Sequence, residues 1–145
     1  MAEHNTIGQL GEQQAVKLLQ DKGFKILETN WRLRNLEVDI IAANKEYIVF
    51  AEVKTRTSTF AGRPEEAVDL VKRKRLVVAA NAYFKYHHET RLIRFDIIGI
   101  LMDKSHEIVE ITHLENAFAP PLRTVNVNSY SGRWRWKHRT KVISR

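Results

Sequence analysis

A chain of 145 residues is long enough to bury one hydrophobic core, and the absence of cysteine excludes disulfides, thiolate metal ligands and thiol nucleophiles. Its hydrophobic share of 43% and charged share of 28% are those of an ordinary globular domain. The longest apolar runs are too short to span a bilayer, and the N-terminus does not resemble a signal peptide. We therefore expect a cytoplasmic protein without membrane contact.

The positive charge is confined to the C-terminal end of the sequence. The formal net charge is +7, from 24 Lys and Arg and 17 Asp and Glu residues. Acidic and basic side chains balance over residues 1–122, so the remaining residues carry the whole net charge. Pro120-Pro121 marks the end of the folded part. The sequence thus predicts an α/β domain over 1–118 and a basic, aromatic-containing tail over 119–145.

The predicted elements follow the order α-β-β-β-α-β-β. Helical spacing predicts a first helix over 5–22, which ends at Gly23. Alternating patterns predict five strands, over residues 24–33, 37–43, 47–54, 91–101 and 107–114. A second helix is expected from Pro64 to about His88, with a core face made of Val68, Val71, Val78 and Ala82. This order favours an α/β fold in which helices flank a mixed sheet.

The second and third predicted strands form a hairpin that gathers charged residues at its open end. A turn within Asn44–Tyr47 sets a register in which the numbers of facing residues sum to 91. Asp39 then faces Glu52, and Glu37 faces Lys54. Opposed Cβ atoms lie ~5 Å apart, which lets two carboxylates bind one cation. The rest of the hairpin is largely apolar, so these charges are expected at a buried position, where unpaired charge is costly.

Two facing carboxylates indicate a site for a hard divalent cation, because each would otherwise repel the other and shift its pKa. The expected ion is Mg²⁺ or Mn²⁺, and the backbone carbonyl of Val53 is a candidate third ligand. Lys54 shares the strand face of Glu52, where it can orient or deprotonate an attacking water or stabilise charge on a phosphate oxygen. A structural ion-pair cluster at a strand end is the alternative interpretation of the same residues.

The hairpin motif, taken together with the first helix, resembles that of the restriction-endonuclease-like superfamily. The matching residues are Asp39, then Glu52-Val53-Lys54, after a first helix with Gly8-x-x-Gly11-Glu12. Members of that superfamily share an α-β-β-β-α-β core. The sequence departs from the pattern at Val38, where many members have Pro before the Asp, without losing a ligand.

More closely, the chain is similar to the bacterial YraN family over nearly all of residues 7–118. The family usually has Gly at the position of Leu36. The matching stretches are Gly8-x-x-Gly11-Glu12, Asn30-x-Arg32, Glu37 to Ala42, Val49 to Arg56, Pro64 to Val68, Arg94-Phe95-Asp96 and Asn116-Ala117-Phe118.

The resemblance implies a metal-dependent endonuclease that hydrolyses phosphodiester bonds of DNA, including branched or processed DNA. The catalytic positions that it implies are Glu12, Asp39, Glu52 and Lys54. Glu12 joins the metal ligands Asp39, Glu52 and Val53 on this resemblance alone. The superfamily's Holliday-junction resolvases cut two-fold symmetric substrates as dimers, so the resemblance also implies a homodimer.

Several residues outside this cluster are candidate nucleic-acid contacts. Arg56 and Lys72 flank the hairpin, although a solvated helix face also explains the basic run that contains Lys72. The tail alternates cations and aromatics at Arg133, Trp134, Arg135 and Trp136. This pattern suits binding of single-stranded or junction DNA. The alternative is that the tail docks on the body of the protein or on a partner subunit. A nucleic-acid-binding module without turnover and a protein-interaction domain are therefore the alternative functions.

Overall fold

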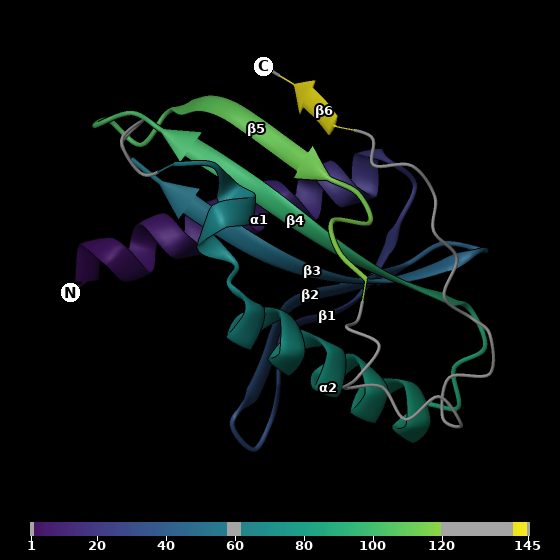
Figure 1. The fold of residues 1–145 in the computed structure, drawn as a ribbon. Helices are drawn as coiled ribbons and strands as arrows, with labels where there is room; N and C mark the ends of the chain where they lie inside the picture. The colour runs from purple at the N-terminus through teal and green to yellow at the C-terminus, as the bar shows by residue number, and fades with distance from the viewer. Residues whose placement is uncertain (1, 58–61, 120–140, 145) are drawn as a thin grey trace.

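The computed structural model describes residues 2–57, 62–119 and 141–144, and in these parts two α-helices lie on opposite faces of one mixed sheet (Figure 1). The predicted α/β class is confirmed. The helices are α1 (Ala2–Asp21) and α2 (Leu70–Tyr86), with the 3-10 helix η2 (Pro64–Ala67) between β3 and α2. The strands are β1 (Lys25–Leu33), β2 (Leu36–Ala43), β3 (Tyr47–Arg56), β4 (Leu92–Met102), β5 (Ile108–Leu114) and β6 (Lys141–Ser144). None of the helices in the described parts is long and apolar enough to cross a membrane.

The strands lie in the sheet in their sequence order, β1 to β6. β3 and β4 are parallel, and every other neighbouring pair is antiparallel. A parallel pair needs a crossover connection, and the segment between β3 and β4 supplies it with η2 and α2. The resulting α-β-β-β-α-β order over α1 to β4 is consistent with a restriction-endonuclease-like core.

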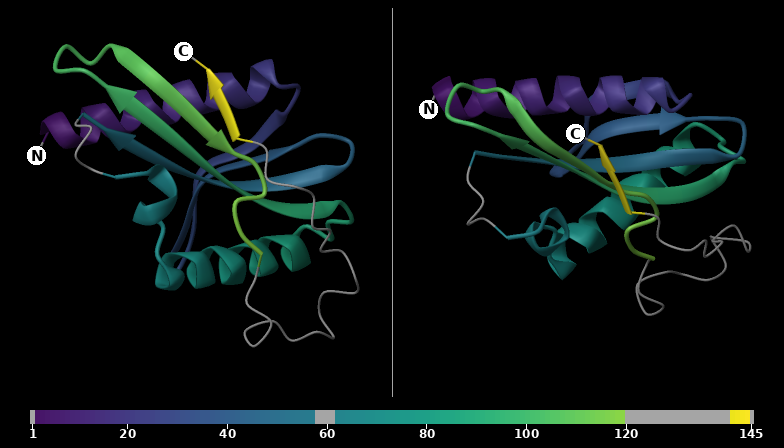
Figure 2. Two further views of the ribbon diagram at one scale, coloured as in Figure 1. Left: turned by 45° about the horizontal axis from the view of Figure 1, so that its top comes forward. Right: turned by 90° about the horizontal axis from the view of Figure 1, so that it is seen from above.

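The two helices lie on opposite faces of the sheet, as the view from above shows (Figure 2), and each packs on its own hydrophobic cluster. Ala15 and Leu19 of α1 pack on Ile40, Val49 and neighbouring residues. On the opposite face, α2 packs on a second cluster. That cluster includes Ile41, Ile48, Phe50, Phe95 and Tyr83. Burial of both sheet faces explains why β3 and β4 are nearly continuous apolar runs.

The predicted second helix is interrupted, because the chain turns between η2 and α2. Val68 is buried in the core at this point, and Asp69 caps α2 by accepting a hydrogen bond from the backbone N of Lys72 at 2.8 Å. The ring of Pro64 packs on Gly99 of β4, where a Cβ atom would overlap it. Pro64 therefore anchors η2 on the sheet and does not begin the long helix.

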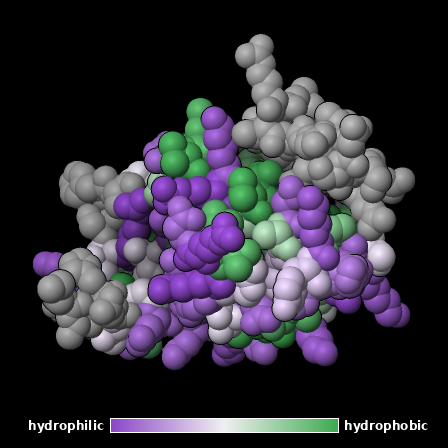
Figure 3. Space-filling model, turned by 90° about the horizontal axis from the view of Figure 1, so that it is seen from below, coloured by the Kyte–Doolittle hydropathy of each residue, from purple (hydrophilic) through white to green (hydrophobic). Residues whose placement is uncertain are grey.

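The predicted core face of this helix was wrong at two positions. Val71 and Val78 are 62% and 51% exposed, whereas α2 buries Leu76, Val77, Ala79, Ala80 and Tyr83. Two apolar stripes run along this helix, and the sequence pattern does not indicate which one faces the sheet. The view from below shows hydrophilic side chains with hydrophobic patches among them (Figure 3).

A strand that the sequence did not predict extends the sheet at its far edge. β6 pairs antiparallel with β5, with Ile111 opposite Ser144 and Leu114 opposite Lys141. The last described residues thus lie on the sheet, although they belong to the region that the sequence interpretation treated as a tail.

Candidate active site

The hairpin of β2 and β3 has the register that the sequence predicted. Ile40 faces Ala51, and the pairing continues to Ala43 facing Ile48, so that facing numbers sum to 91. Counted from the turn toward the open end of the hairpin, the last regular pair is at Ile40, the neighbour of Asp39. There the Oδ2 atom of Asp39 accepts a hydrogen bond from the backbone N of Val53 at 2.8 Å. The side chain of Asp39 thus takes the place of a backbone hydrogen bond between β2 and β3, at the point where the predicted site begins.

The alternation of side chains along β2 also changes at Asp39. Val38 belongs to the core cluster beneath α2, whereas Ile40, two residues later, belongs to the cluster beneath α1. Two residues apart on a regular strand would share a face. Asp39 consequently lies where the strand switches faces, and it is within reach of groups on both sides of the sheet.

Glu52 is the most buried carboxylate of the candidate site, with 3% of the residue exposed. Its Oε1 atom lies 3.5 Å from the Nζ atom of Lys54 and 3.5 Å from the Nζ atom of Lys72. Its Oε2 atom is buried and has no hydrogen-bond partner among the described residues. A buried carboxylate oxygen without a partner carries a large desolvation cost unless a cation reaches it.

The negative charge of Asp39 perturbs the pKa of Glu52, as the sequence argument expected. Burial and the negative charge of Asp39 together raise the pKa of Glu52 to about 7, against the opposing effect of Lys72 and Lys54. Burial also raises the pKa of Asp39, while the hydrogen bond from Val53 and the charge of Lys72 act in the opposite direction. A divalent cation would neutralise both groups and remove this conflict.

Glu12 of α1 lies near the pair, on the other side of Asp39. Glu12 and Asp39 line one cavity of about 300 Å³, together with Asn30. The side-chain N of Asn30 donates a hydrogen bond to Oε2 of Glu12 at 3.0 Å. Burial raises the pKa of Glu12, and the charges of Asp39 and Glu37 add to the increase, although the Asn30 hydrogen bond opposes it.

The donor set fits a magnesium-like ion bound with few protein ligands. Among the described residues, no three His, Asp or Glu side chains converge closely enough to hold a metal ion by themselves. Mg²⁺ commonly uses one or two carboxylates and completes its shell with water and substrate phosphate. Asp39 and Glu52 provide two carboxylates, and the partnerless Oε2 atom of Glu52 provides an oxygen for a cation.

Two features of the site were missed or underestimated from the sequence. Lys72 was predicted only as a nucleic-acid contact, yet it reaches Glu52 from α2. Asn30, which holds Glu12, has a left-handed backbone with φ of 50°. Asn is among the few non-glycine residues that tolerate this region, so an isolated Asn within a strand pattern was the available signal.

The other predicted contacts are only partly placed. Arg56 ends β3 with a buried Nε atom that has no hydrogen-bond partner among the described residues. Glu37 pairs with Arg32 across the first hairpin, at 3.5 Å, while Lys54 pairs with Glu52. The tail residues Arg133, Trp134, Arg135 and Trp136 lie outside the described residues.

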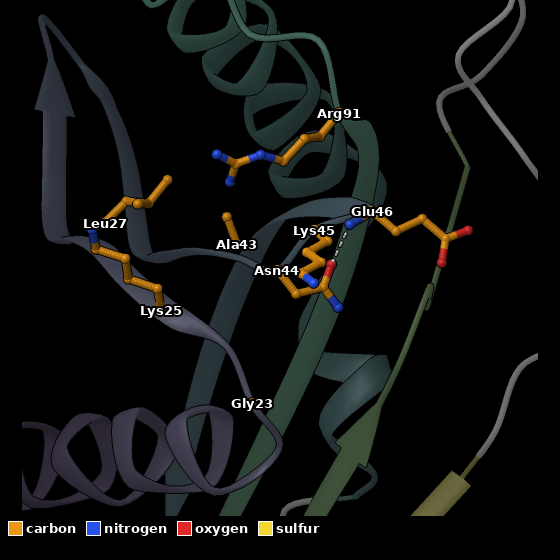
Figure 4. A pocket seen from close by; sticks show the side chains of 8 residues that line it. All are labelled: Gly23, Lys25, Leu27, Ala43, Asn44, Lys45, Glu46 and Arg91. Carbon is orange, nitrogen blue, oxygen red and sulfur yellow. Dashed lines mark hydrogen bonds between the residues drawn. The ribbon is translucent and has the colours of Figure 1, made fainter.

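A larger hollow of about 760 Å³ lies at the turn end of the β2–β3 hairpin (Figure 4). Lys25, Lys45 and Arg91 contribute to its lining, and Glu46 points away from the other labelled side chains. Its single carboxylate and several cations do not suit a metal ion. The smaller and more acidic site at the open end therefore remains the candidate active site.

The uncharacterised protein family UPF0102 matches residues 11–100, which include α1 from Gly11, the hairpin and most of β4. The chain belongs to family UPF0102. This finding confirms the predicted resemblance at the level of the YraN-like family.

Relatives match most of the chain and nearly their own full lengths. A UPF0102 protein of Bacteroides thetaiotaomicron is 46% identical over 122 residues, which are 84% of this chain and 99% of the relative. One of Flavobacterium psychrophilum is 43% identical over 118 residues, with 81% and 98% covered. One of Porphyromonas gingivalis is 39% identical over 118 residues, with 81% and 87% covered. Their names state the family and no activity.

Proposed function

We propose that this UPF0102 protein is a Mg²⁺- or Mn²⁺-dependent endonuclease that hydrolyses phosphodiester bonds of DNA, including branched or processed DNA. The observation that carries the proposal is the buried Glu52 carboxylate beside Asp39. One of its oxygens lacks a partner among the described residues, and the other lies between two lysine ammonium groups. Membership of the restriction-endonuclease-like superfamily is part of this proposal, and the α-β-β-β-α-β order supports it.

Asp39 and Glu52 would hold the cation, with the Val53 carbonyl as a further ligand and Glu12 approaching from α1. When bound, the cation supplies Lewis-acid activation of the phosphate and of a water molecule. The Nζ atom of Lys54, which lies 3.5 Å from Oε1 of Glu52, would orient an attacking water toward phosphorus. The water oxygen would bond to phosphorus and lose its proton to solvent, while the bond from phosphorus to the leaving sugar oxygen breaks and that oxygen takes up a proton from solvent. Lysine ammonium groups would stabilise the extra negative charge.

A cleavage assay with purified protein tests this proposal. Labelled four-way junctions, flaps, nicked duplexes, linear duplexes and an RNA duplex are each incubated with Mg²⁺ or Mn²⁺ and with EDTA. We expect cleavage of at least one DNA substrate in either metal and none in EDTA. Asp39→Ala should lose at least about 100-fold in rate, whereas Glu107→Gln, an exposed carboxylate change on the β4–β5 turn, should cleave normally.

The result that overturns the proposal is absence of cleavage by the wild-type chain, or equal cleavage by Asp39→Ala. RNA cleavage without DNA cleavage would overturn the assignment of DNA as the substrate. Intact folding of Asp39→Ala is checked by circular dichroism and by thermal unfolding.

A nucleic-acid-binding module without turnover is the second candidate, and the concentration of charge beyond residue 122 favours it. Seven cations correspond to a log–log salt slope of about −6 on duplex DNA. Because β6 pairs with β5, substitution is a cleaner test than deletion of the tail. Four cations of the tail are replaced with Gln, namely Arg133, Arg135, Lys137 and Arg139.

We expect these four substitutions to flatten the slope by roughly 3–4. The matched control changes four exposed cations of the body to Gln, namely Lys17, Lys45, Lys85 and Lys104. If the body substitutions flatten the salt slope and the tail substitutions do not, nucleic acid binds to the domain and not to the tail. Altered oligomeric mass in sedimentation, with unchanged affinity for DNA, would instead support the protein-interaction alternative.

A further inference from the structure

Two ammonium groups lie close to Glu52 Oε1, and they come from different elements of the fold. Lys54 lies two residues along the same strand, whereas Lys72 reaches the oxygen from α2, across the layer between helix and sheet. Both Nζ atoms lie at 3.5 Å, and both lysine side chains are about one third exposed, at 31% and 32%. Lys54 is a counterion from the same strand, whereas the charge of Lys72 acts on both Glu52 and Asp39. Lys72 is therefore the ammonium group that stands where a cation shared by the two carboxylates would act.

The Lys72 contact is an ion pair without a short hydrogen bond. A charge-assisted hydrogen bond is ordinarily about 2.7–2.9 Å long, which is shorter than this contact. The backbone N of Lys72 is fixed by the cap residue Asp69 at 2.8 Å, but its side chain extends from the first turn of α2 toward a partly exposed position. Its backbone is therefore fixed, while its charged end has access to solvent.

We propose that Lys72 is an exchangeable counterion of the active site, which occupies Glu52 in the absence of a divalent cation and is released to a substrate phosphate when the cation binds. This inference rests on the proposed function. A cation bound by Asp39 and by Oε2 of Glu52 would neutralise the same carboxylate that Lys72 contacts through Oε1, and it would repel the lysine ammonium group. The released lysine would lie at the edge of the site, where a phosphate next to the bound cation would attract it.

The consequence is a competition that can be measured without catalysis. Removal of the Lys72 charge leaves Asp39 and Glu52 with less positive charge, so a divalent cation should bind more tightly. Isothermal titration of metal-free protein with Mn²⁺ compares the wild type, Lys72→Met, Lys72→Arg and Lys74→Met. Lys74 is the matched control, because it is an exposed lysine of the same helix.

We expect Lys72→Met to bind Mn²⁺ about three- to tenfold more tightly than the wild type, given the partial exposure of the group. Lys74→Met should match the wild type, and Lys72→Arg should remain near it because the competing charge is kept. A wild-type protein that binds no Mn²⁺ would overturn the proposed function itself. Mn²⁺ binding by the wild type, with equal or weaker binding by Lys72→Met, would overturn only the role of Lys72.

A second measurement tests the release to phosphate. Affinity for a labelled four-way DNA junction is measured by anisotropy in Ca²⁺, which serves as a non-activating ion, and in EDTA. Lys72→Met should weaken binding about three- to tenfold in Ca²⁺ and clearly less in EDTA. An equal loss in both conditions would identify Lys72 as an ordinary basic contact and overturn the exchange. If Lys72→Met does not fold, Lys72→Gln takes its place in both measurements.

Discussion

The side chain of Asn30 in β1 donates a hydrogen bond to the carboxylate of Glu12 in α1 at 3.0 Å, and this contact joins two residues of one cavity beside Asp39. Asn30 adopts a positive φ of 50°, between the strand pairs Thr29–Ile40 and Trp31–Val38. A local backbone distortion in the edge strand thus aims a side chain at the helix. Glu12, which the sequence connected to the site only through resemblance, acquires a physical connection in this way.

Substitutions at Asn30 should separate backbone conformation from side-chain contact. Asn30→Gly loses the hydrogen bond but tolerates the positive φ, so we expect a free energy of unfolding within about 0.5 kcal/mol of the wild type. Asn30→Ala loses the hydrogen bond and also the tolerance of a positive φ, so it should be less stable than the wild type by about 1–2 kcal/mol. Urea unfolding checks both values. Both variants should bind Mn²⁺ more weakly; wild-type affinity in Asn30→Gly would show that the contact does not position a ligand.

The burial of Glu52 predicts an inverse dependence of stability on pH in metal-free protein. Its folded pKa, about 7, exceeds the ordinary glutamate value of 4.5, so the folded state binds the proton more tightly. Stability is therefore lost as pH rises from about 4.5 to about 7, by no more than about 3 kcal/mol. Urea unfolding in EDTA at several pH values measures this loss.

Glu52→Gln should remove most of this pH dependence, whereas the exposed control Glu107→Gln should retain it. Saturating Mg²⁺ should restore wild-type stability above pH 7, because the ion binds only the folded state. An unchanged pH profile in Glu52→Gln would contradict the assignment of this titration to Glu52.

The two glycines of α1 should respond to alanine in opposite directions. A Cβ atom at Gly11 would overlap the side chain of Thr55 on β3, whereas none of the described atoms outside the helix lies within 4 Å of a Cβ atom at Gly8. Gly8→Ala should stabilise the protein by about 0.5–1 kcal/mol through helix propensity. Gly11→Ala should destabilise it by about 1–3 kcal/mol, because the overlap outweighs that gain. Thermal unfolding of the two variants measures both effects, and stabilisation by Gly11→Ala would refute the close contact.

A second buried polar cluster should behave as a structural element. Asp96 forms two hydrogen bonds with the Arg94 guanidinium, at 2.9 and 2.8 Å, and accepts another from Nε2 of His113 at 2.7 Å. Burial would raise the pKa of Asp96, but these partners hold it below its ordinary value. Asp96→Asn leaves the Arg94 charge poorly compensated and should destabilise the protein by about 3–5 kcal/mol.

The double variant Arg94→Met with Asp96→Leu should be more stable than Asp96→Asn, because no buried charge remains from the pair. Since the pKa of Asp96 is lowered, the stabilisation that it provides is present above about pH 4 and is lost as pH falls. This window lies below that of Glu52. Urea unfolding at pH 3 to 5 distinguishes the two carboxylates.

The parts of the site that follow from local spacing were predicted from the sequence. Strand alternation and the turn at Asn44–Tyr47 predict a register in which Asp39 faces Glu52. That register is confirmed in the pairs from Ile40 to Ala43, which stop next to Asp39. The ladder hydrogen bond that Asp39 replaces was not predicted, because it depends on the divergence of the strands. Glu37 was expected to face Lys54, but Glu37 forms an ion pair with Arg32 and Lys54 forms one with Glu52.

The parts that depend on packing between distant elements were not predictable in the same way. Either apolar stripe of α2 satisfies helical spacing, and the choice follows from the crossover and from Pro64 resting on Gly99. The role of Lys72 depends on that choice, since only the observed rotation brings it to Glu52. β6 gave too short a pattern to distinguish a strand from a tail.

The parallel pairing of β3 with β4 bears on how the site assembles during folding. Asp39 and Glu52 belong to one hairpin with a short turn, and such local pairs form quickly. Lys72 and Glu12 reach them only after the crossover helix and the N-terminal helix have docked on opposite faces, which involves slow, non-local contacts. We therefore expect the acidic pair to form early and its lysine and glutamate neighbours late, so that catalytic competence would report completion of both layers of the fold.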